Sequence, residues 1–361
     1  MSNVKGGAFA LAALVALTGL SGCSAGTVED LSKDAAKGIV AGEKIGTSGL
    51  VKKACEEGSL TYYTAQTAED ERDITEAFEA AYPCIKIDIV SSVTGRLYER
   101  LVTESSAKKT TADVALLTDV GLTSELSDKK LIEKWDPPSA DKYPTDRKSP
   151  GEWYSASASL MYFIYNNKQI SESEAPKTWE DLLDSKWRGK ISTSGPTIGG
   201  TGWSMFWYLQ DQFGTDYWRD LAAQKPVMFD SYSGVVTSVA RGETSIAIEC
   251  DLCDYVARTE QDAPLTPVYP DEGTVYVPYP MARIADAPNP NAGELFANWY
   301  LSQQGQEQLV KTRGAYSGRD DVDPAKGKPA LSSLKTFTPS TETVVRDREK
   351  LIKEFREIFE G

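Results

Sequence analysis

The feature that most constrains the fold is an alternation between strand-like and helix-like patterns that begins at Leu60. Apolar runs at 60–63 and 112–117 and alternating isoleucines at 85–90 are typical of strands, whereas residues with helical spacing lie between them. A β-α-β-α-β order implies parallel strands joined by right-handed crossovers. The sequence therefore predicts a parallel α/β lobe.

A second group of patterns follows an apolar run at 160–165. They are a capped helix that starts at Thr178 with Asp181 three residues later, a strand at 190–193, helices at 203–213 and 233–241, a strand at 245–249, extended returns at 274–277 and 281–284, and helices at 291–310 and 345–359. We expect lobe 1 to comprise 55–160 and 280–361 and lobe 2 to comprise 161–279. Two crossings would form a hinge with a ligand cleft between the lobes, although two tandem domains would give a similar pattern.

Composition narrows the possible functions. The chain has 53 acidic and 39 basic residues, a formal net charge of −14 and no histidine. Binding to nucleic acid is disfavoured, because it requires a basic surface that neutralises phosphates. The absence of histidine excludes Ser-His-Asp and Cys-His hydrolases and zinc sites with histidine ligands. Binding is therefore favoured over catalysis, with no cofactor expected.

The first residues are typical of an exported lipoprotein. Lys5 precedes an apolar stretch at 8–20 that is too short to span a bilayer, and the stretch leads through small residues to Cys23. We expect a signal peptide at 1–22, acylation of Cys23 and a tether at 23–54. The protein would then be anchored outside the cytoplasm on a bacterial membrane. An ordinary secretory signal with a chance cysteine is the alternative.

Four cysteines remain after Cys23, which is an even number for an oxidising compartment. Cys55 and Cys84 each precede a predicted parallel strand, so the starts of the two strands would bring them within disulfide range. Cys250 and Cys253 form a CxxC motif without a second one. A local disulfide, free thiols and a redox motif all remain open for this pair.

Loops after the predicted strands carry the residue types that bind oxyanions. Ser, Thr and Gly at helix starts allow backbone N–H groups and hydroxyls to converge on an anion, although the same residues also cap helices. A second possibility involves tyrosine, because phenolates bind hard cations and aromatic faces can cage organic cations, while most tyrosines simply pack. The candidate ligand-binding residues are Thr64, Gln66, Thr94, Gly95, Asp119, Gly199, Gly200, Thr201, Tyr232, Ser233, Gly234 and Tyr255. The alternative for Asp119 is a helix cap, and the sequence leaves a metal site open.

A series of short motifs adds to this pattern. They are YTAQ at 63–66, EAFEAAYP at 76–83, ADV at 112–114, PKTWEDLL at 176–183, WRGK at 187–190, VARGE at 239–243, APNPNA at 287–292 and LSQQGQ at 301–306. In this order the chain resembles the solute-binding lipoproteins of ABC importers, in the cluster that contains ferric-ion-binding proteins. The resemblance implies the two-lobed type 2 periplasmic-binding-protein fold with a crossover hinge, closure on a small molecule, and delivery to permease subunits without catalysis.

The chain departs from the ferric-binding pattern at three places. Thr67 and Ala68 stand where those proteins carry a His or Tyr, and the segment 250–255 has one tyrosine instead of an adjacent pair. The anion-holding arginine is also absent from 155–159. We therefore expect a phosphonate, an organophosphate or a similar anion, with ferric iron or a ferric chelate as the alternative. An exported enzyme and a thiol oxidoreductase are further alternatives, and we expect the chain to act as a monomer.

Overall fold

The computed structural model describes residues 27–28, 31–259 and 261–360, so the predicted signal peptide and Cys23 lie outside the described residues. The α-helices are α1 (Ser48–Glu57), α2 (Ala68–Ala81), α3 (Thr94–Ser106), α4 (Val120–Asp128), α5 (Gly200–Phe213), α6 (Thr215–Ala223), α7 (Tyr232–Arg241), α8 (Asp251–Thr259), α9 (Pro290–Tyr300), α10 (Gln303–Arg313) and α11 (Thr341–Phe359). The strands are β1 (Ile39–Val40), β2 (Glu43–Lys44), β3 (Ser59–Thr64), β4 (Lys86–Ser91), β5 (Val114–Leu116), β6 (Lys148–Ser149), β7 (Trp153–Asn166), β8 (Ile191–Ser194), β9 (Val227–Phe229), β10 (Ile246–Cys250), β11 (Leu265–Val268), β12 (Thr274–Arg283) and β13 (Thr336–Phe337).

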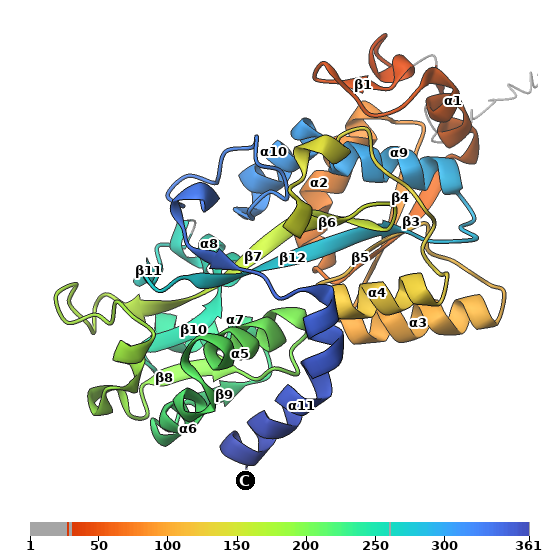
Figure 1. The fold of residues 1–361 in the computed structure, drawn as a ribbon. Coiled ribbons are helices and arrows are strands. Elements are labelled where there is room, and N and C mark those ends of the chain that lie inside the picture. The colour runs from red at the N-terminus through yellow and green to blue at the C-terminus, as the bar shows by residue number, and fades with distance from the viewer. Residues whose placement is uncertain (1–26, 29–30, 260, 361) are drawn as a thin grey trace, which may run out of the picture.

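One mixed sheet runs through the molecule in the order β4-β3-β5-β12-β7-β10-β8-β9. Strands β3, β4 and β5 are parallel to one another and form the first lobe with helices α1–α4, α9 and α10; β8, β9 and β10 are likewise parallel and form the second lobe with α5–α8 (Figure 1). The predicted two-lobed α/β architecture is confirmed. Long antiparallel strands β7 and β12 connect the two lobes.

The strand registers make the two lobes face each other through the carboxyl ends of their strands. Strand β5 pairs antiparallel with the last part of β12, whereas β10 pairs antiparallel with the last part of β7. Because β7 and β12 are themselves antiparallel, β5 and β10 run towards each other from opposite ends of this strand pair. The loops after the strands, where α/β proteins bind ligands, therefore converge at the lobe junction.

The predicted lobe boundaries at residues 160 and 280 fall inside β7 and β12. The two extended returns that the sequence indicates at 274–277 and 281–284 are one strand, which accommodates Pro278 and Pro280 with a shift of register between Tyr279 and Pro280. A proline cannot donate to a strand ladder, and a bulge relieves that loss.

The helix predicted at 291–310 is two helices, α9 and α10. Leu301 ends α9, and the side chain of Ser302 caps α10 by accepting a hydrogen bond from the Gly305 N–H group. Helix α9 packs its aromatic face on the first lobe, where the Phe296 ring lies 5.1 Å from Tyr62 and 5.2 Å from Phe78. The helical spacing of apolar residues is therefore present, but the cap at Ser302 divides the segment into two helices.

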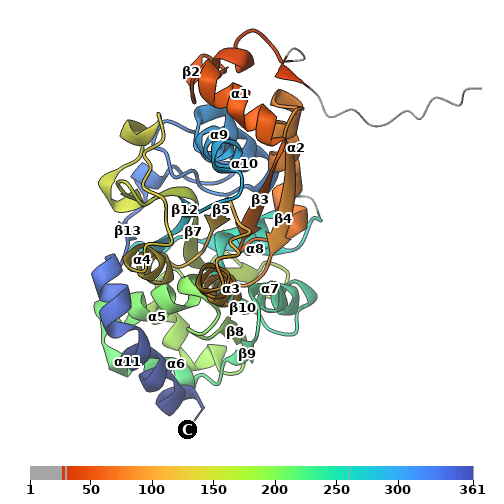
Figure 2. The same cartoon turned by 90° about the vertical axis from the view of Figure 1, so that its right-hand side faces the viewer.

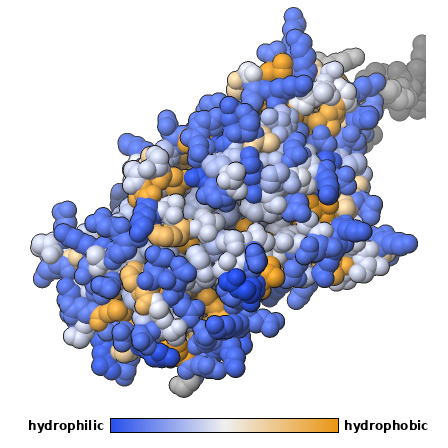
Figure 3. Space-filling view, in the orientation of Figure 1, coloured by the Kyte–Doolittle hydropathy of each residue, from blue (hydrophilic) through white to orange (hydrophobic). Residues whose placement is uncertain are grey.

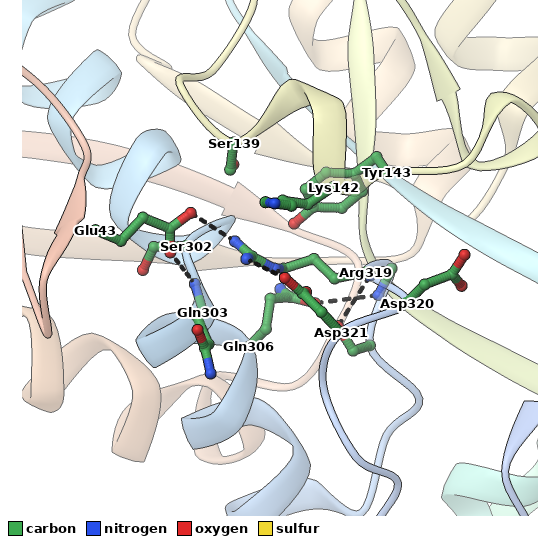
Figure 4. Close-up of polar contacts among 12 residues, drawn as sticks. Glu43, Ser139, Lys142, Tyr143, Ser302, Gln303, Gln306, Arg319, Asp320 and Asp321 are labelled. Atoms are coloured by element: carbon green, nitrogen blue, oxygen red, sulfur yellow. Dashed lines mark hydrogen bonds and ion pairs between the residues drawn. The ribbon is translucent and has the colours of Figure 1, made fainter.

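The segment predicted as a tether up to residue 54 is folded in its second half, and this corrects the prediction. Helix α1 packs on α9 and buries Val51 and Ala54 completely. Glu43 of β2 accepts a hydrogen bond from Arg319 at 2.8 Å, and Arg319 also pairs with Asp321 (Figure 4). These contacts come from distant parts of the chain, so the weak local pattern of residues 35–54 did not predict them.

Helix α11 also differs from the prediction, which assigned residues 280–361 to lobe 1. It packs against α4 of the first lobe and against α5 and α6 of the second lobe (Figures 1 and 2). Its apolar stripe explains the second contact, because the Phe355 ring lies 4.7 Å from the Phe206 ring of α5. The C-terminal helix thus spans the two lobes on the outside of their junction.

The face shown in Figure 3 is mainly hydrophilic, with scattered apolar patches. Within the described ranges, no helix is long enough and apolar enough to cross a membrane.

Candidate functional site

Thr118, which follows β5, lies where the first lobe contacts the start of α5 in the second lobe. Its Oγ1 lies 2.9 Å from Thr94 Oγ1 at the start of α3. A Cβ built on Gly200, the first residue of α5, would lie 2.2 Å from the Thr118 carbonyl oxygen. Gly199 has a φ of +88°, a conformation that favours glycine. The two glycines therefore allow the α5 helix start to approach the first lobe.

A space of about 10 Å³ lies between these loops, and its lining includes Thr118, Asp119, Gly200 and Ser204. A single water needs about 10–15 Å³ on this measure. The two lobes are therefore closed on each other at this point.

Two tyrosines and a threonine form the polar interior beside this contact. Tyr279 of β12 has its hydroxyl 3.4 Å from Thr201 Oγ1 of α5. The Tyr232 hydroxyl lies 3.3 Å from the position that a Cβ on Gly202 would take. Burial raises the pKa of both phenols, and each of Tyr279 and Glu249 raises the pKa of Tyr232 further. Both tyrosines are therefore neutral hydrogen-bonding groups here.

Arg313, at the end of α10, contributes a buried guanidinium to the first-lobe side of the site. It is 9% exposed, and its Nη2 donates to Gln66 Oε1 at 2.6 Å. Its Nη1 contacts Glu71 Oε1 at 3.2 Å, and its charge lowers the pKa of Tyr279 against the effect of burial. Gln66 follows β3 and is separated from Arg313 by 247 positions. No local pattern in the sequence pointed to Arg313.

Asp251 joins the second lobe to strand β7. Its Oδ1 accepts hydrogen bonds from the Leu160 N–H group at 2.8 Å and from Ser159 Oγ at 2.9 Å. Its Oδ2 forms a fully buried ion pair with Lys328. The charge and both oxygens of Asp251 are therefore paired with protein groups. Its contacts hold the start of α8 against strand β7.

Some of the ligand-binding residues predicted from the sequence lie where the lobes meet, and others are exposed or form only local hydrogen bonds. Thr94, Gly199, Gly200, Thr201 and Tyr232 lie at or beside the contact between the lobes, and Gln66 lies beside Arg313. Thr64 is buried and accepts a hydrogen bond from the Gln66 N–H group at 3.1 Å. Gly95 and Ser233 are exposed, and Gly234 donates to its own helix cap, Ser231.

Tyr255 of α8 packs its ring against Gly314, the residue that follows Arg313. The ring lies 5.1 Å from the Lys328 ammonium group, and Tyr255 lines a cavity of about 530 Å³ with Gln303 and Lys311. Its recorded contacts are therefore with the end of α10 and with Lys328.

Asp119 caps helix α4, as the alternative for this residue stated. Its Oδ1 accepts from the Leu122 N–H group at 3.0 Å, and both carboxylate oxygens pair with Arg348 of α11. Both oxygens are thus occupied by protein groups. The neighbouring Thr118 carried the same signal of a polar residue after a strand, and it could have been found from the sequence.

The structure pairs Cys55 with Cys84 and Cys250 with Cys253. The second disulfide encloses the first turn of α8, directly after β10. Among the described residues, no group of three or more Cys, Asp or Glu side chains is arranged to hold a metal ion.

Comparison with known proteins identifies the kind of protein to which this architecture belongs. Residues 109–343 match the family model described as bacterial extracellular solute-binding protein. A putative 2-aminoethylphosphonate-binding periplasmic protein of Salmonella typhi is 25% identical over 293 residues, which are 77% of this chain and 84% of that protein. An Fe(3+)-binding periplasmic protein of Serratia marcescens is 25% identical over 279 residues, with coverage of 74% and 81%.

The fold has close counterparts among solved structures. The periplasmic binding protein AfuA from Actinobacillus pleuropneumoniae superimposes with a TM-score of 0.73 at 24% identity, covering 84% of this chain and 99% of that one. This similarity concerns the fold.

Proposed function

The chain belongs to the family of bacterial extracellular solute-binding proteins, and we propose that it captures a small organic oxyanion, such as a phosphonate or an organophosphate, for an ABC importer. The observation that carries this proposal is the buried Arg313 guanidinium, which donates to Gln66 in the loop after β3 and pairs with Glu71. Guanidinium groups bind phosphate and carboxylate oxygens with paired, charge-assisted hydrogen bonds. Arg313 supplies the cation that segment 155–159 lacks.

Ligand capture would proceed by closure of the lobes. Arg313, Gln66 and Thr94 would hold the ligand from the first lobe, and Thr201 and Tyr232 from the second, in addition to the N–H groups at the start of α5. The positive end of a helix dipole favours an anion at that position. Because a ligand shifts an equilibrium only through its differential affinity for the two states, contacts from both lobes are required. Permease subunits would then recognise the closed state.

One relative supports the same proposal. The Salmonella typhi protein, which is named for a phosphonate, aligns with 77% of this chain. We further propose that acylated Cys23 holds the protein at the membrane, that residues 24–34 form the tether, and that the chain acts as a monomer without catalysis. The lobe junction would lie within β7 and β12.

Ferric iron or a ferric chelate is the second candidate, because Tyr232 and Tyr279 place two phenols in the same interior and the Serratia marcescens relative is named for iron. Against it, burial raises the pKa of both phenols, so neither is prepared to be a phenolate. Among the described residues, no group of three or more carboxylates is arranged to hold a metal ion.

A thermal-shift screen of residues 24–361, stripped of bound solute, would test the proposal. The panel contains alkylphosphonates, sugar phosphates, carboxylates, ferric citrate and ferric chloride with chelator controls. A compound at about 100 times its dissociation constant adds about 2.7 kcal/mol, which moves the melting temperature by several degrees. Stabilisation by a phosphonate or a phosphate is expected. Stabilisation confined to the iron samples would overturn the oxyanion proposal.

A charge-reversal variant adds a test of position. Thr201→Asp places a negative charge beside Tyr279 and should abolish stabilisation by the oxyanion. Thr103→Asp is the matched control, because Thr103 is exposed on α3 and is not among the candidate ligand-binding residues. Equal ligand responses of the wild type and the Thr201→Asp variant would place the anion elsewhere.

A further inference from the structure

Glu249 of β10 is a fully buried carboxyl group without a partner. The side chain is 0% exposed, and within the described part of the chain neither Oε1 nor Oε2 has a hydrogen-bond partner. Most buried polar groups in folded proteins are paired, because an unpaired one loses its hydration without compensation. A buried carboxyl group without a hydrogen bond among the described residues is therefore a candidate to receive a donor from a bound solute.

The charges around Glu249 show which kind of partner is missing. Asp251 is paired with Lys328, and Asp254 is paired with Arg258. Each neighbouring cation is therefore paired with another carboxylate, and Arg258 Nη2 has no hydrogen-bond partner among the described residues. Burial raises the pKa of Glu249 well above its ordinary value, and the charges of Asp254 and Asp251 raise it further. The cluster has three carboxyl groups and two cations, so its charges balance while Glu249 holds a proton, and an ionised Glu249 would require one further positive charge.

Glu249 lies at the ligand-facing end of the second lobe. The parallel register of β8 and β10 pairs Ala247 with Ser192, and two residues further along it brings Ser194 beside Glu249 on the same face of the sheet. Ser194 is the last residue of β8; it is 1% exposed and its Oγ also has no partner among the described residues. The charge of Glu249 raises the pKa of Tyr232, the first residue of α7. Unpaired oxygens therefore gather where the strands of the second lobe end.

We propose that Glu249, with Ser194 Oγ beside it, receives a primary ammonium group of the transported solute. The solute class would then be zwitterionic, with its oxyanion directed to Arg313 and its amine to Glu249. This inference rests on the oxyanion-binding function proposed above. An ammonium group supplies that further positive charge and three N–H donors for the unpaired oxygens. A metal ion fits less well, because the oxygens of Asp251 and Asp254 are already engaged.

The inference is tested with compounds that differ in the amine alone. 2-Aminoethylphosphonate and propylphosphonate have the same length, as do 3-aminopropanoate and butanoate. Titration calorimetry of the wild type should show tighter binding of the amino compound in at least one pair. In the Glu249→Gln variant the affinity for that amino compound should fall by about 10- to 100-fold, the range for a lost charge-assisted hydrogen bond. The affinity for its amine-free partner should stay within about threefold.

A matched control is Glu243→Gln, which removes an exposed carboxylate from the same lobe and should change neither affinity. Melting temperatures of the ligand-free variants establish that both are folded. If the two members of each pair bind equally and Glu249→Gln changes neither, the ammonium assignment is wrong while the oxyanion receptor stands. If none of the four compounds binds the wild type and iron alone does, the proposed oxyanion function is wrong. The ammonium assignment, which rests on that function, is then wrong as well.

Discussion

Arg348 of α11 forms an ion pair with Asp119, the N-cap residue of α4, and so ties the C-terminal helix to the first lobe. The Asp119 side chain is 1% exposed and the Arg348 side chain 22% exposed. The same helix packs Phe355 against Phe206 of the second lobe. Helix α11 therefore joins the two lobes on the outside of their junction, whereas the loops after the strands meet on its inside.

Removing this link should destabilise the protein. In Arg348→Ala the buried Asp119 loses its cation but keeps the Leu122 N–H group, so we expect a loss of about 2 kcal/mol in the free energy of unfolding. Urea denaturation measures it. Arg346→Ala is the control, since Arg346 pairs with Asp347 on the exposed surface and its loss should change the stability little. Equal losses in the two variants would show that the Arg348–Asp119 pair is not a stabilising link.

Gly200→Ala should impair closure of the lobes. The added methyl group would lie 2.2 Å from the Thr118 carbonyl oxygen, so the closed arrangement cannot form without displacing backbone. We expect at least a tenfold loss of affinity for 2-aminoethylphosphonate, measured by calorimetry, and a larger radius of gyration in its presence by small-angle scattering. Gly95→Ala has no atom within 4 Å of the new Cβ and serves as the control. Wild-type affinity in Gly200→Ala would mean that binding does not require this contact.

Arg313 should contribute both to stability and to ligand binding. A double variant of Arg313 and Glu71 separates these two contributions. Arg313→Met alone leaves the buried Glu71 without its cation, which should cost about 3–5 kcal/mol in urea denaturation. Adding Glu71→Gln removes the uncompensated charge and should recover most of that loss. The double variant should still fail to bind the phosphonate. If it is stable and binds as the wild type does, Arg313 has a purely structural role.

The raised pKa of Glu249 predicts a pH-dependent stability of the ligand-free protein. The folded state holds a proton that the unfolded state releases near pH 4.5, so this carboxyl lowers the stability progressively as the pH rises from 4.5 towards its folded-state pKa. Glu249→Gln removes the effect. The variant should therefore gain more stability over the wild type at pH 8 than at pH 5 when melting temperatures are compared. An equal gain at both pH values would contradict a buried, protonated Glu249.

The two disulfides should differ in their contribution to stability. Cys55–Cys84 spans a sequence separation of 29 residues, whereas Cys250–Cys253 spans 3. In the chain-entropy model, replacing the first pair by alanine costs about 3–4 kcal/mol and replacing the second about 2 kcal/mol. Urea denaturation of both double variants tests the order. The Cys250→Ala, Cys253→Ala variant should also retain phosphonate binding; loss of binding in a folded variant would indicate that this disulfide shapes the site.

Local sequence patterns were sufficient for most of the elements that form the two lobes. Alternating isoleucines predicted β4, helical spacing predicted α2 and α11, and the position of Asp119 before Val120 predicted its cap. The pattern was insufficient where an element depends on distant support. Helix α1 has a weak pattern of its own and is held by packing on α9, some 240 residues away along the chain.

The sequence by itself determined the α/β class, the order of the strands along the chain and the hydroxyl- and glycine-rich loops at their ends, because periodicity and capping are properties of neighbouring residues. The tertiary structure alone decided that Arg313 lies beside Gln66, that Thr118 meets Gly200, and that neither carboxyl oxygen of Glu249 has a hydrogen-bond partner among the described residues. Those relationships depend on which segments the sheet brings together and on how many charges are buried with them. Packing across long sequence separations determines both, and no local pattern records it.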